Sequence, residues 1–201
     1  MNLQETFGSI DIYLFDQLLK GRLMPGMTLL DAGCGGGRNL VYFMRHGFSV
    51  FGVDQSASVI TQIRALAAEL APDLSPDNFR VESIDSMSFA DESFDVVLSS
   101  AVLHFARDEE HWLSMVREMW RVLKPGGIFF ARLSSTIGIE DQIQHIRCRI
   151  FRLPGGTEWF LVDAAMLEEV TSALGGEWLE PFKTVVVHKT RSMATWCLRK
   201  C

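Results

Sequence analysis

The chain has 201 residues, of which 48% are hydrophobic and 22% are charged. This composition is typical of globular proteins and argues against intrinsic disorder. Because domains commonly hold about 100–200 residues, we expect residues 1–201 to form a single domain. The formal net charge of −6 and the isoelectric point near 5.4 argue against a nucleic-acid partner, since domains that bind nucleic acids usually carry a basic face.

The sequence also gives no sign of a membrane or secreted protein. The first residues are polar and do not show the charged and apolar segments of a signal peptide. No apolar run approaches the roughly 20 residues of a membrane helix. The four cysteines are scattered without the spacing of a zinc site. We therefore expect reduced thiols, no metal site, no membrane partner and a cytoplasmic location.

Short β-rich segments alternate with helical patterns along the first half of the chain. In the N-terminal segment, Phe7, Ile10, Tyr13 and Leu14 recur at helical spacing, which predicts a cap helix within residues 1–25 that covers a crevice. The elements predicted next, in chain order, are a strand at 27–33, a helix at 38–47, a strand at 48–54, a helix at 56–70 and a strand at 78–83.

The second half of the chain begins with a strand at 94–100, whose many Val and Leu residues indicate burial on both faces. We expect residues 134–160, which are irregular, to form a lid or an insertion, and the last two β-like runs to form a hairpin. The remaining predicted elements are a helix at 108–127 that Pro125 and two glycines end, a strand at 127–133, a helix at 163–176, and the two runs at 178–190 and 193–200.

This order of elements predicts an α/β fold of the Rossmann-like, doubly wound type, with a mostly parallel sheet, helices on both faces and a C-terminal antiparallel hairpin. In such sheets, ligands bind beyond the C-terminal ends of the strands, near the point where the strand order reverses. The fold therefore brings four segments around one crevice: residues 31–37, Asp54, residues 83–85 and residues 99–104.

The segment 29–39, LLDAGCGGGRN, joins a predicted strand to a predicted helix. Its glycines allow a tight turn and a close approach of a ligand to the backbone. A dinucleotide fingerprint needs a third glycine, but that position holds Arg38 or Leu40, depending on the glycine that begins the motif. Asp31 would also repel a pyrophosphate here, and it would attract an ammonium group through a charge-assisted hydrogen bond.

Asp54 follows at the end of the next predicted strand. An acidic residue at this position can accept hydrogen bonds from the hydroxyl groups of a ribose. We therefore expect a ligand that has a ribose, such as an adenosine, together with a cationic group near Asp31 in place of a diphosphate.

Taken together, the pattern D-x-G-C-G-x-G, the acid at Asp54, and the segments FDVVLSSAVLHF and LKPGG resemble class I S-adenosylmethionine-dependent methyltransferases. The resemblance extends over nearly the whole chain. It is similar to the small-molecule type, including the tellurite-resistance-like group and the methyltransferase domain 11 and 25 groups. It implies a seven-stranded sheet and S-adenosyl-L-methionine as cofactor, a ligand that has a ribose, an adenine and an ammonium group but no phosphate.

The resemblance also implies which residues bind this cofactor. It places Asp31 beside the methionine part and Asp54 on the ribose. Many members carry an Asp six residues before the Phe of an LPF segment, whereas this chain has Ser83 six residues before the Phe of MSF. The adenine contact then falls to Ser83 or, through a shifted turn, to Asp85. The full set implied to bind the cofactor is Asp31, Gly33, Cys34, Gly35, Arg38, Asn39, Asp54, Gln55, Ser83, Ile84, Asp85, Ser99 and Ser100.

Two residues are candidates for the chemistry itself. His104 follows the strand at 94–100 and could act as a general base, because an unperturbed histidine titrates near pH 6.5. The alternative is a structural histidine that lines the pocket. Tyr13, in the predicted cap helix, could reach the methyl-transfer site or could simply pack. His111, His145 and His188 show no partner pattern, so we expect surface or packing roles for them.

The irregular segment 134–160 offers further candidates. Arg147, Arg149 and Arg152, with Arg132 nearby, could bind an anionic group of a substrate, since arginine matches carboxylate geometry. The alternative is a solvated surface. Trp159 and Phe160 could line a lid or could pack in the core.

The leading interpretation is an enzyme that transfers a methyl group from S-adenosyl-L-methionine to a small-molecule nucleophile by direct in-line displacement. In this reaction the cofactor carries the reactivity and the protein orients the reactants. Two alternatives are an NAD-dependent oxidoreductase and a non-catalytic protein that binds S-adenosylmethionine. We expect a monomer or a homodimer with a small-molecule acceptor as partner.

Overall fold

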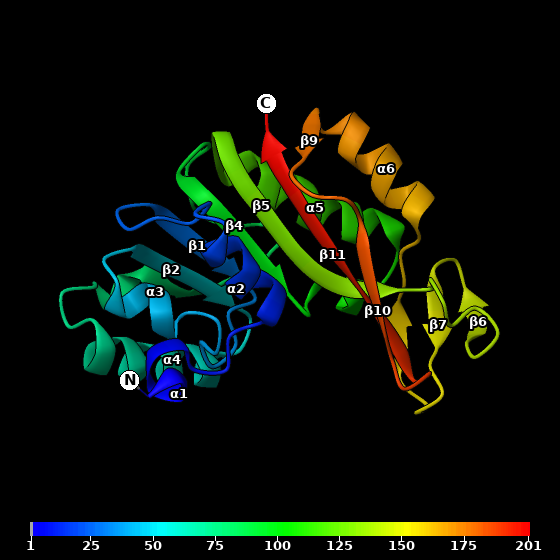
Figure 1. Ribbon diagram of the computed structural model, residues 1–201, viewed down its shortest axis with the longest axis horizontal. Helices are drawn as coiled ribbons and strands as arrows, with labels where there is room; N and C mark the ends of the chain where they lie inside the picture. Colours follow the sequence, from blue (N-terminus) through cyan, green and yellow to red (C-terminus); the bar gives the residue numbers. More distant parts are fainter. Residues whose placement is uncertain (1) are drawn as a thin grey trace.

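The computed structural model describes residues 2–201, and its central layer is a twisted, mostly parallel sheet (Figure 1). The strands lie in the order β10-β11-β5-β4-β1-β2-β3, and β9 also pairs with β11. Only β11 runs antiparallel to its neighbours in the described chain. The predicted fold class is thus confirmed. The bounds are β1 Thr28–Ala32, β2 Ser49–Asp54, β3 Phe79–Val81, β4 Phe94–Ser100, β5 Leu123–Ser135, β9 Gly176–Trp178, β10 Lys183–Val187 and β11 Arg191–Lys200.

Helices cover both faces of this sheet (Figure 1). One face carries α2 (Ile12–Leu19), α3 (Val41–Arg45) and α4 (Ala57–Leu70), and the other carries α5 (Glu109–Val122) and α6 (Ala164–Ala173). A short helix, α1 (Leu3–Phe7), packs beside α3, and two single turns, η1 (Pro76–Asn78) and η2 (Leu103–Phe105), complete the helical elements. Across residues 2–201, every helix falls short of the length and apolarity that a membrane span requires.

The alternation of side chains along each strand divides the apolar interior into two cores. Successive residues of a strand point to opposite faces of the sheet, so Leu29 packs toward α2, α3 and α4 while Leu30 packs toward α5 and α6. On the second side, the buried ring of Trp112 lies between Phe160 and Trp196, at centroid distances of 5.9 and 5.7 Å. Both faces of the central strands are therefore dry, as the Val- and Leu-rich run 94–100 predicts.

Two predicted helices are shorter than expected. The helix predicted at 38–47 begins only at Val41, because Gly37 has a φ of +78° and the amide of Leu40 bonds back to the carbonyl of Gly37 at 2.8 Å. The helix predicted at 108–127 ends at Val122. Leu123 is fully buried and already pairs with Phe94 of β4, so strand β5 begins before the proline and glycines that were expected to end the helix.

The predicted C-terminal hairpin is interrupted. The run 178–190 divides into β9 and β10 at Glu180 and Pro181. Proline lacks the N–H group that a ladder needs, and the Glu180 carboxylate turns into a cluster of cations instead of continuing the strand. Strands β10 and β11 do form a hairpin, with Val187 paired to Arg191.

The irregular segment 134–160 contains its own antiparallel sheet, formed by β6 (Gln144–Arg147), β7 (Ile150–Arg152) and β8 (Glu158–Phe160). The sheet lies beside the far ends of β10 and β11 (Figure 1). Trp159 of β8 stacks on the ring of His104 in η2, with 4.2 Å between centroids. Arg149 adds a second anchor, because its Nη1 bonds to the Asp163 carboxylate at 2.9 Å.

The N-terminal segment holds two helices in place of the single predicted cap helix, since Gly8 with a φ of +61° ends α1. Asp11 then fixes the start of α2. Its carboxylate accepts the amide of Tyr13 at 2.9 Å and pairs with Nε of Arg132 on β5 at 3.3 Å, while its own amide donates to Oδ1 of Asn39 at 2.9 Å. This set of contacts holds α2 beside the C-terminal end of β5 and the glycine loop.

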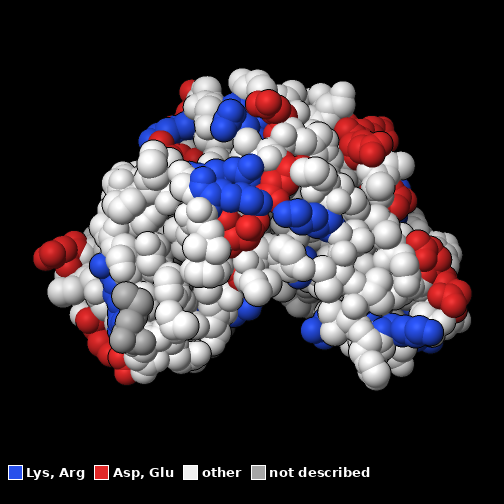
Figure 2. All heavy atoms as spheres, in the orientation of Figure 1, with Lys and Arg blue, Asp and Glu red and all other residues white. Residues whose placement is uncertain are grey.

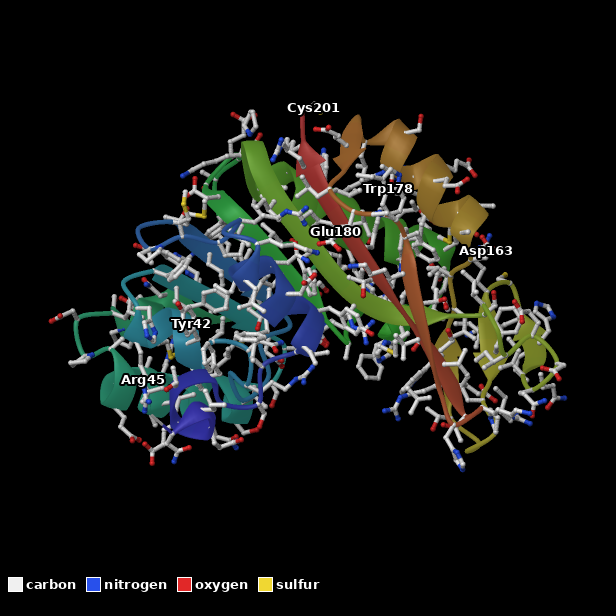
Figure 3. The ribbon with its side chains drawn as sticks, viewed as in Figure 1. Tyr42, Arg45, Asp163, Trp178, Glu180 and Cys201 are labelled. Atoms are coloured by element: carbon white, nitrogen blue, oxygen red, sulfur yellow. The ribbon has the colours of Figure 1, made fainter. Side chains whose placement is uncertain are left out.

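A buried glutamate joins the N-terminal helix to the C-terminal strands. Glu180 accepts hydrogen bonds from Gln17 at 2.6 Å, Lys20 at 2.7 Å, Arg22 at 2.6 Å and also Lys183. Figure 2 shows basic and acidic side chains side by side in the upper middle of this face, and Figure 3 shows Glu180 there, at the turn into β10. The neighbouring cations and amide hold the pKa of Glu180 at about 2, although burial acts in the opposite direction.

This cluster predicts how stability depends on acid. Glu180→Gln should lower the free energy of unfolding by about 1–3 kcal/mol near neutral pH, because three cations lose their shared anion while remaining partly hydrated. A depressed carboxyl pKa contributes stability above the unfolded value, and this contribution is lost as the pH falls. Urea unfolding from about pH 7 to pH 3 should therefore show the difference shrinking. Glu177→Gln, at an exposed glutamate on β9, is the control. An equal loss at both ends of the range would contradict this account.

Candidate functional site

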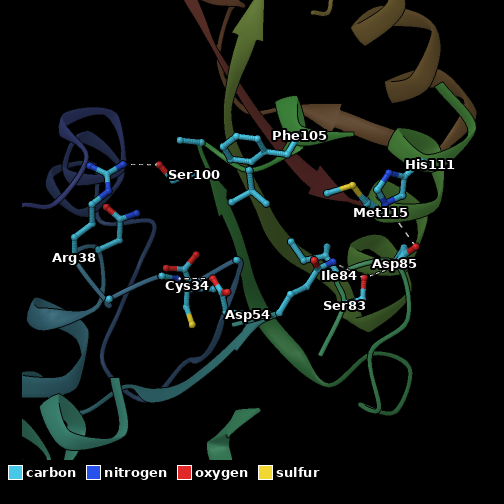
Figure 4. Close-up of a pocket in the computed structure, with 18 of the residues that line it drawn as sticks. Cys34, Arg38, Asp54, Ser83, Ile84, Asp85, Ser100, Phe105, His111 and Met115 are labelled. Atoms are coloured by element: carbon cyan, nitrogen blue, oxygen red, sulfur yellow. Dashed lines mark hydrogen bonds and ion pairs between the residues drawn. The ribbon is translucent and has the colours of Figure 1, made fainter. Parts of the chain in front are cut away.

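A cavity of about 660 Å³ opens at the C-terminal ends of β1, β2 and β4 (Figure 4). This is the edge of the sheet at which the sequence places the ligand. Among the described residues, every one that the resemblance assigns to the cofactor lines the cavity except Ser99. The residues that the sequence did not single out for the cofactor are Gly36, Ala101, Val102, Phe105, Arg107, His111 and Met115.

The glycine loop is tied directly to the second strand. The amides of Gly33 and Cys34 both donate to the carbonyl of Val53, at 2.8 and 2.9 Å. Gly33 has a φ of +85°, and a Cβ atom at this position would lie 2.5 Å from a methyl group of Val102. Only glycine therefore allows the loop to pass between β2 and the segment that follows β4.

Asp31 is the most deeply buried acid of the cavity wall, with 2% of its surface exposed. Its Oδ1 atom has no hydrogen-bond partner among residues 2–201. Burial raises the pKa of this carboxyl to about 7; Arg38 lowers it and Asp54 raises it further. A buried carboxylate without a partner is costly, so Asp31 is suited to a ligand that brings a positive charge and hydrogen-bond donors.

Asp54 both shapes the loop and faces the cavity. Its Oδ2 accepts the amide of Gly35 at 3.1 Å, and its Oδ1 accepts the amide of Ser56 at 2.9 Å. A carboxylate offers about four lone-pair sites, so each oxygen can still accept a further hydrogen bond. Figure 4 shows Asp54 beside Cys34 at the edge of the cavity. Burial raises the pKa of the Cys34 thiol, which stays protonated.

The wall on the side of β3 is polar and internally bonded. Nε2 of Gln55 donates to the hydroxyl of Ser83 at 3.0 Å, and that hydroxyl donates to Oδ1 of Asp85. Ser83 is the main cause of the lowered pKa of Asp85, and His111 and Arg107 also lower it. Ile84 adds an apolar surface to the same wall. These side chains suit a flat ligand with one polar edge.

The wall beyond β4 is more apolar. Nη2 of Arg38 donates to the hydroxyl of Ser100 at 3.1 Å, next to Ala101 and Val102. Phe105 follows in η2 and stays 62% exposed although it lines the cavity. The predicted pair of serines is divided, since neighbouring strand residues point to opposite faces. The Ser99 hydroxyl is fully buried and, within the described chain, has no hydrogen-bond partner.

Neither candidate for the chemistry belongs to the cavity wall formed by residues 2–201. His104 is 3% exposed and stacked on Trp159, and burial lowers its pKa to about 4, so the ring is neutral at physiological pH. The ring of Tyr13 lies under the guanidinium of Arg132, 4.4 Å from its carbon to the ring centroid. Each instead supports the cavity from behind: His104 under the insertion and Tyr13 under α2.

The arginines of the insertion are occupied within the protein. Arg149 pairs with Asp163 and Glu109, and Arg152 pairs with Glu158. The cations that do face the cavity, Arg38 and Arg107, lie elsewhere in the chain. His111, which the sequence suggested was a packing residue, and Met115 lie on the first turns of α5 and complete the wall. Their separation of four residues places them on one helix face, but only the packing of α5 shows which face meets the cavity.

The comparison with known proteins gives a family match. The profile of the methyltransferase domain family matches residues 30–131, just over half of the chain. A ubiquinone biosynthesis O-methyltransferase of Brucella anthropi is 35% identical over 109 residues, which cover 54% of this chain and 42% of that protein. The chain thus spans less than half the length of this curated relative.

Solved structures extend the likeness to the whole fold. A Pyrococcus horikoshii protein aligns with 100% of this chain and 97% of its own, with a TM-score of 0.73 and 19% identity. The 1,6-didemethyltoxoflavin-N1-methyltransferase of Burkholderia thailandensis, solved with 1,6-didemethyltoxoflavin and S-adenosylhomocysteine, aligns over 99% of this chain and 81% of its own, with a TM-score of 0.73 and 17% identity.

The raised pKa of Asp31 makes a prediction about the ligand-free protein. Because the fold disfavours the ionised form, the wild type should lose stability relative to Asp31→Asn as the pH rises from about 4 to about 7, and the difference should then stay constant. A shift of about three units corresponds to at most about 4 kcal/mol. Denaturant unfolding across this range measures it, with Asp73→Asn at an exposed site as the control. A difference that does not change with pH would contradict the burial of a charge at Asp31.

Proposed function

This chain belongs to the methyltransferase domain family, whose cofactor is S-adenosyl-L-methionine, and from that premise we propose that it methylates an oxygen nucleophile on a small aromatic molecule. The observation that carries the proposal is the pair of acids, Asp31 and Asp54, on one cavity wall. Asp31 is buried with an unpartnered oxygen, and Asp54 keeps free acceptor sites on both oxygens. A ligand with an ammonium group and a ribose meets both demands.

The residues present fit this cofactor. Asp31 would bind the ammonium, Asp54 the two ribose hydroxyls, and the wall of Gln55, Ser83 and Asp85 the adenine. The open loop at Gly35, where a Cβ atom would meet nothing within 4 Å in the described chain, leaves room for the ligand. The nicotinamide alternative is not favoured, because Asp31 would face a pyrophosphate at this place.

When bound, the cofactor supplies an electrophilic methyl group for direct in-line transfer to the acceptor. The protein's contribution is position, since holding two reactants in a near-attack arrangement can supply roughly 7–11 kcal/mol of the barrier. Ser100 and Val102 form the wall beyond β4, where the cavity continues toward its mouth at Phe105. The cavity volume of about 660 Å³ lies within the usual range of ligand pockets, roughly 300–1,000 Å³.

Two observations favour an aromatic hydroxyl as acceptor. The exposed ring of Phe105 offers a flat apolar face at the cavity mouth, and aromatic pairs contribute about 0.5–1.5 kcal/mol beyond the area they bury. In addition, the Brucella relative is named an O-methyltransferase, although this chain matches only 42% of it. We infer that α1 and α2 cap the acceptor side and that the sheet β6–β8 braces η2 from outside, within a single domain. His104, neutral and covered by Trp159, is better placed to brace η2 than to remove a proton.

Cofactor binding can be tested at Asp54. Asp54→Ala should weaken the binding of S-adenosylhomocysteine by more than about tenfold, because hydrogen bonds to a charged group are each worth about 1.5–3 kcal/mol. The same change releases the amide of Gly35, so part of the loss comes from a looser glycine loop. Isothermal titration calorimetry measures the affinity, and Glu69→Ala, on the exposed face of α4, is the control. Unchanged affinity would remove Asp54 from the site.

The acceptor class can be tested by turnover. With S-adenosylmethionine, we expect substituted catechols and phenols to give methyl ethers and equimolar S-adenosylhomocysteine, detected by mass spectrometry, ahead of matched anilines and thiophenols. Phe105→Ala should raise KM about tenfold with little change in kcat, since it removes ground-state contact. Val186→Ala, at an exposed valine of β10, is the control. His104→Ala with unaltered turnover would leave His104 as a supporting residue. Preferred methylation of nitrogen or sulfur would reject the oxygen acceptor, and cofactor binding without any turnover would favour a non-catalytic protein.

A further inference from the structure

The carboxylate of Asp85 is held at both of its oxygens. Oδ1 accepts the hydroxyl proton of Ser83, and Oδ2 lies 3.6 Å from Nε2 of His111 on α5 (Figure 4). The Ser83 hydroxyl is in turn oriented by Gln55, which donates to it at 3.0 Å. The chain of contacts thus runs from the end of β2, through the turn after β3, to the first turn of α5.

The ring of His111 has a defined orientation in this chain. Its Nδ1 accepts the backbone amide of Arg107 at 3.1 Å, so the ring proton lies on Nε2, the nitrogen that faces Asp85. The backbone of His111 is fixed as well, because its own amide donates to the carboxylate of Asp108 at 2.8 Å, which caps α5. The side chain is 15% exposed and belongs to the cavity wall. His111 therefore presents a directed donor to Asp85.

The position of Asp85 has a chemical consequence. Ser83 stands where many relatives of similar sequence carry an acid, so this wall would lack an anionic acceptor without Asp85. With one lone pair of each oxygen engaged by Ser83 and His111, Asp85 keeps others for a ligand. The contacts of Ser83, His111 and Arg107 all lower the pKa of Asp85, so it is ionised in the working range.

We propose that Asp85 recognises the exocyclic amino group of the cofactor's base, and that His111 is the positioning residue that holds Asp85 in place for this contact. The inference rests on the proposed function, since it concerns the base end of the same cavity. It assigns to His111 a role in cofactor selectivity through Asp85, without contact between His111 and the reacting atoms. Arg107 contributes through its backbone amide, which fixes the tautomer of the ring.

A pair of ligands separates amino recognition from general binding. S-adenosylhomocysteine has an amino group at the position where S-inosylhomocysteine has a carbonyl oxygen. A site built to accept an N–H donor rejects an analogue that lacks it, because buried polar groups are left unpaired. We expect the wild type to prefer S-adenosylhomocysteine by more than about tenfold in calorimetry, and Asp85→Asn to lose most of this preference.

Two substitutions of His111 then test the positioning role. In His111→Gln, the amide nitrogen lies near the position of Nε2 and can still donate to Asp85. In His111→Asn, the amide oxygen replaces Nδ1 as the acceptor for Arg107, but nothing reaches Asp85. We expect glutamine to keep the preference within about twofold and asparagine to reduce it by about fivefold or more. Glu110→Ala, on the exposed side of the same helical turn, is the matched control.

The outcomes separate this inference from the function on which it rests. Equal preference in the glutamine and asparagine variants, or a preference that Asp85→Asn leaves intact, overturns the role of His111 and Asp85 while the methyltransferase activity stands. Failure of the wild type to bind S-adenosylhomocysteine overturns the proposed function itself. One measurement needs no variant: long-range ¹H–¹⁵N NMR of the histidines should show the Nε2-protonated tautomer for His111, and the Nδ1-protonated tautomer would overturn the inference.

Discussion

The amides of Gly33 and Cys34 meet at one carbonyl, that of Val53, and this shared acceptor joins the end of β1 to the end of β2. The contact exists only because the backbone at Gly33 adopts a conformation that other residues rarely reach, in a space that a side chain would fill. Once it forms, Asp31 and Asp54 lie at the same edge of the sheet, and the amide of Gly35 bonds to Asp54. The ligand site follows from this one junction.

Electrostatics gives that junction its chemical character. The parallel strands exclude water from Asp31, so the cost of its charge is carried by the fold until a cationic ligand offsets it. Asp54 and Asp85, at other points of the wall, are satisfied by amide, hydroxyl and imidazole donors and remain ready to accept more. The cavity therefore carries one strained acid and two relaxed ones, an arrangement that fits a ligand with a charged end and a neutral, hydrogen-bonding body.

The other half of the site depends on long-range packing. Arg132, buried at the end of β5, bonds to Asp11 ahead of α2 and to Thr195 on β11, and its guanidinium lies over Tyr13. On the opposite side, Trp159 covers His104 and so braces the turn that carries Phe105. The acceptor side is thus bounded by segments from both ends of the chain, and Glu180 holds the same two ends together on the face shown in Figure 2.

The sequence by itself determined the order of strands and helices, the edge of the sheet that binds a ligand, and the chemistry of Asp31 and Asp54, because periodicity and glycine patterns act locally. Tertiary structure decided what local patterns do not encode. It ended α5 at Val122, where Leu123 found a buried partner in β4, and it turned Ser99 away from Ser100. It also withdrew His104 behind Trp159 and brought His111 to Asp85. These outcomes depend on which face of an element meets its neighbour, and that is set by the packing of residues far apart in the chain.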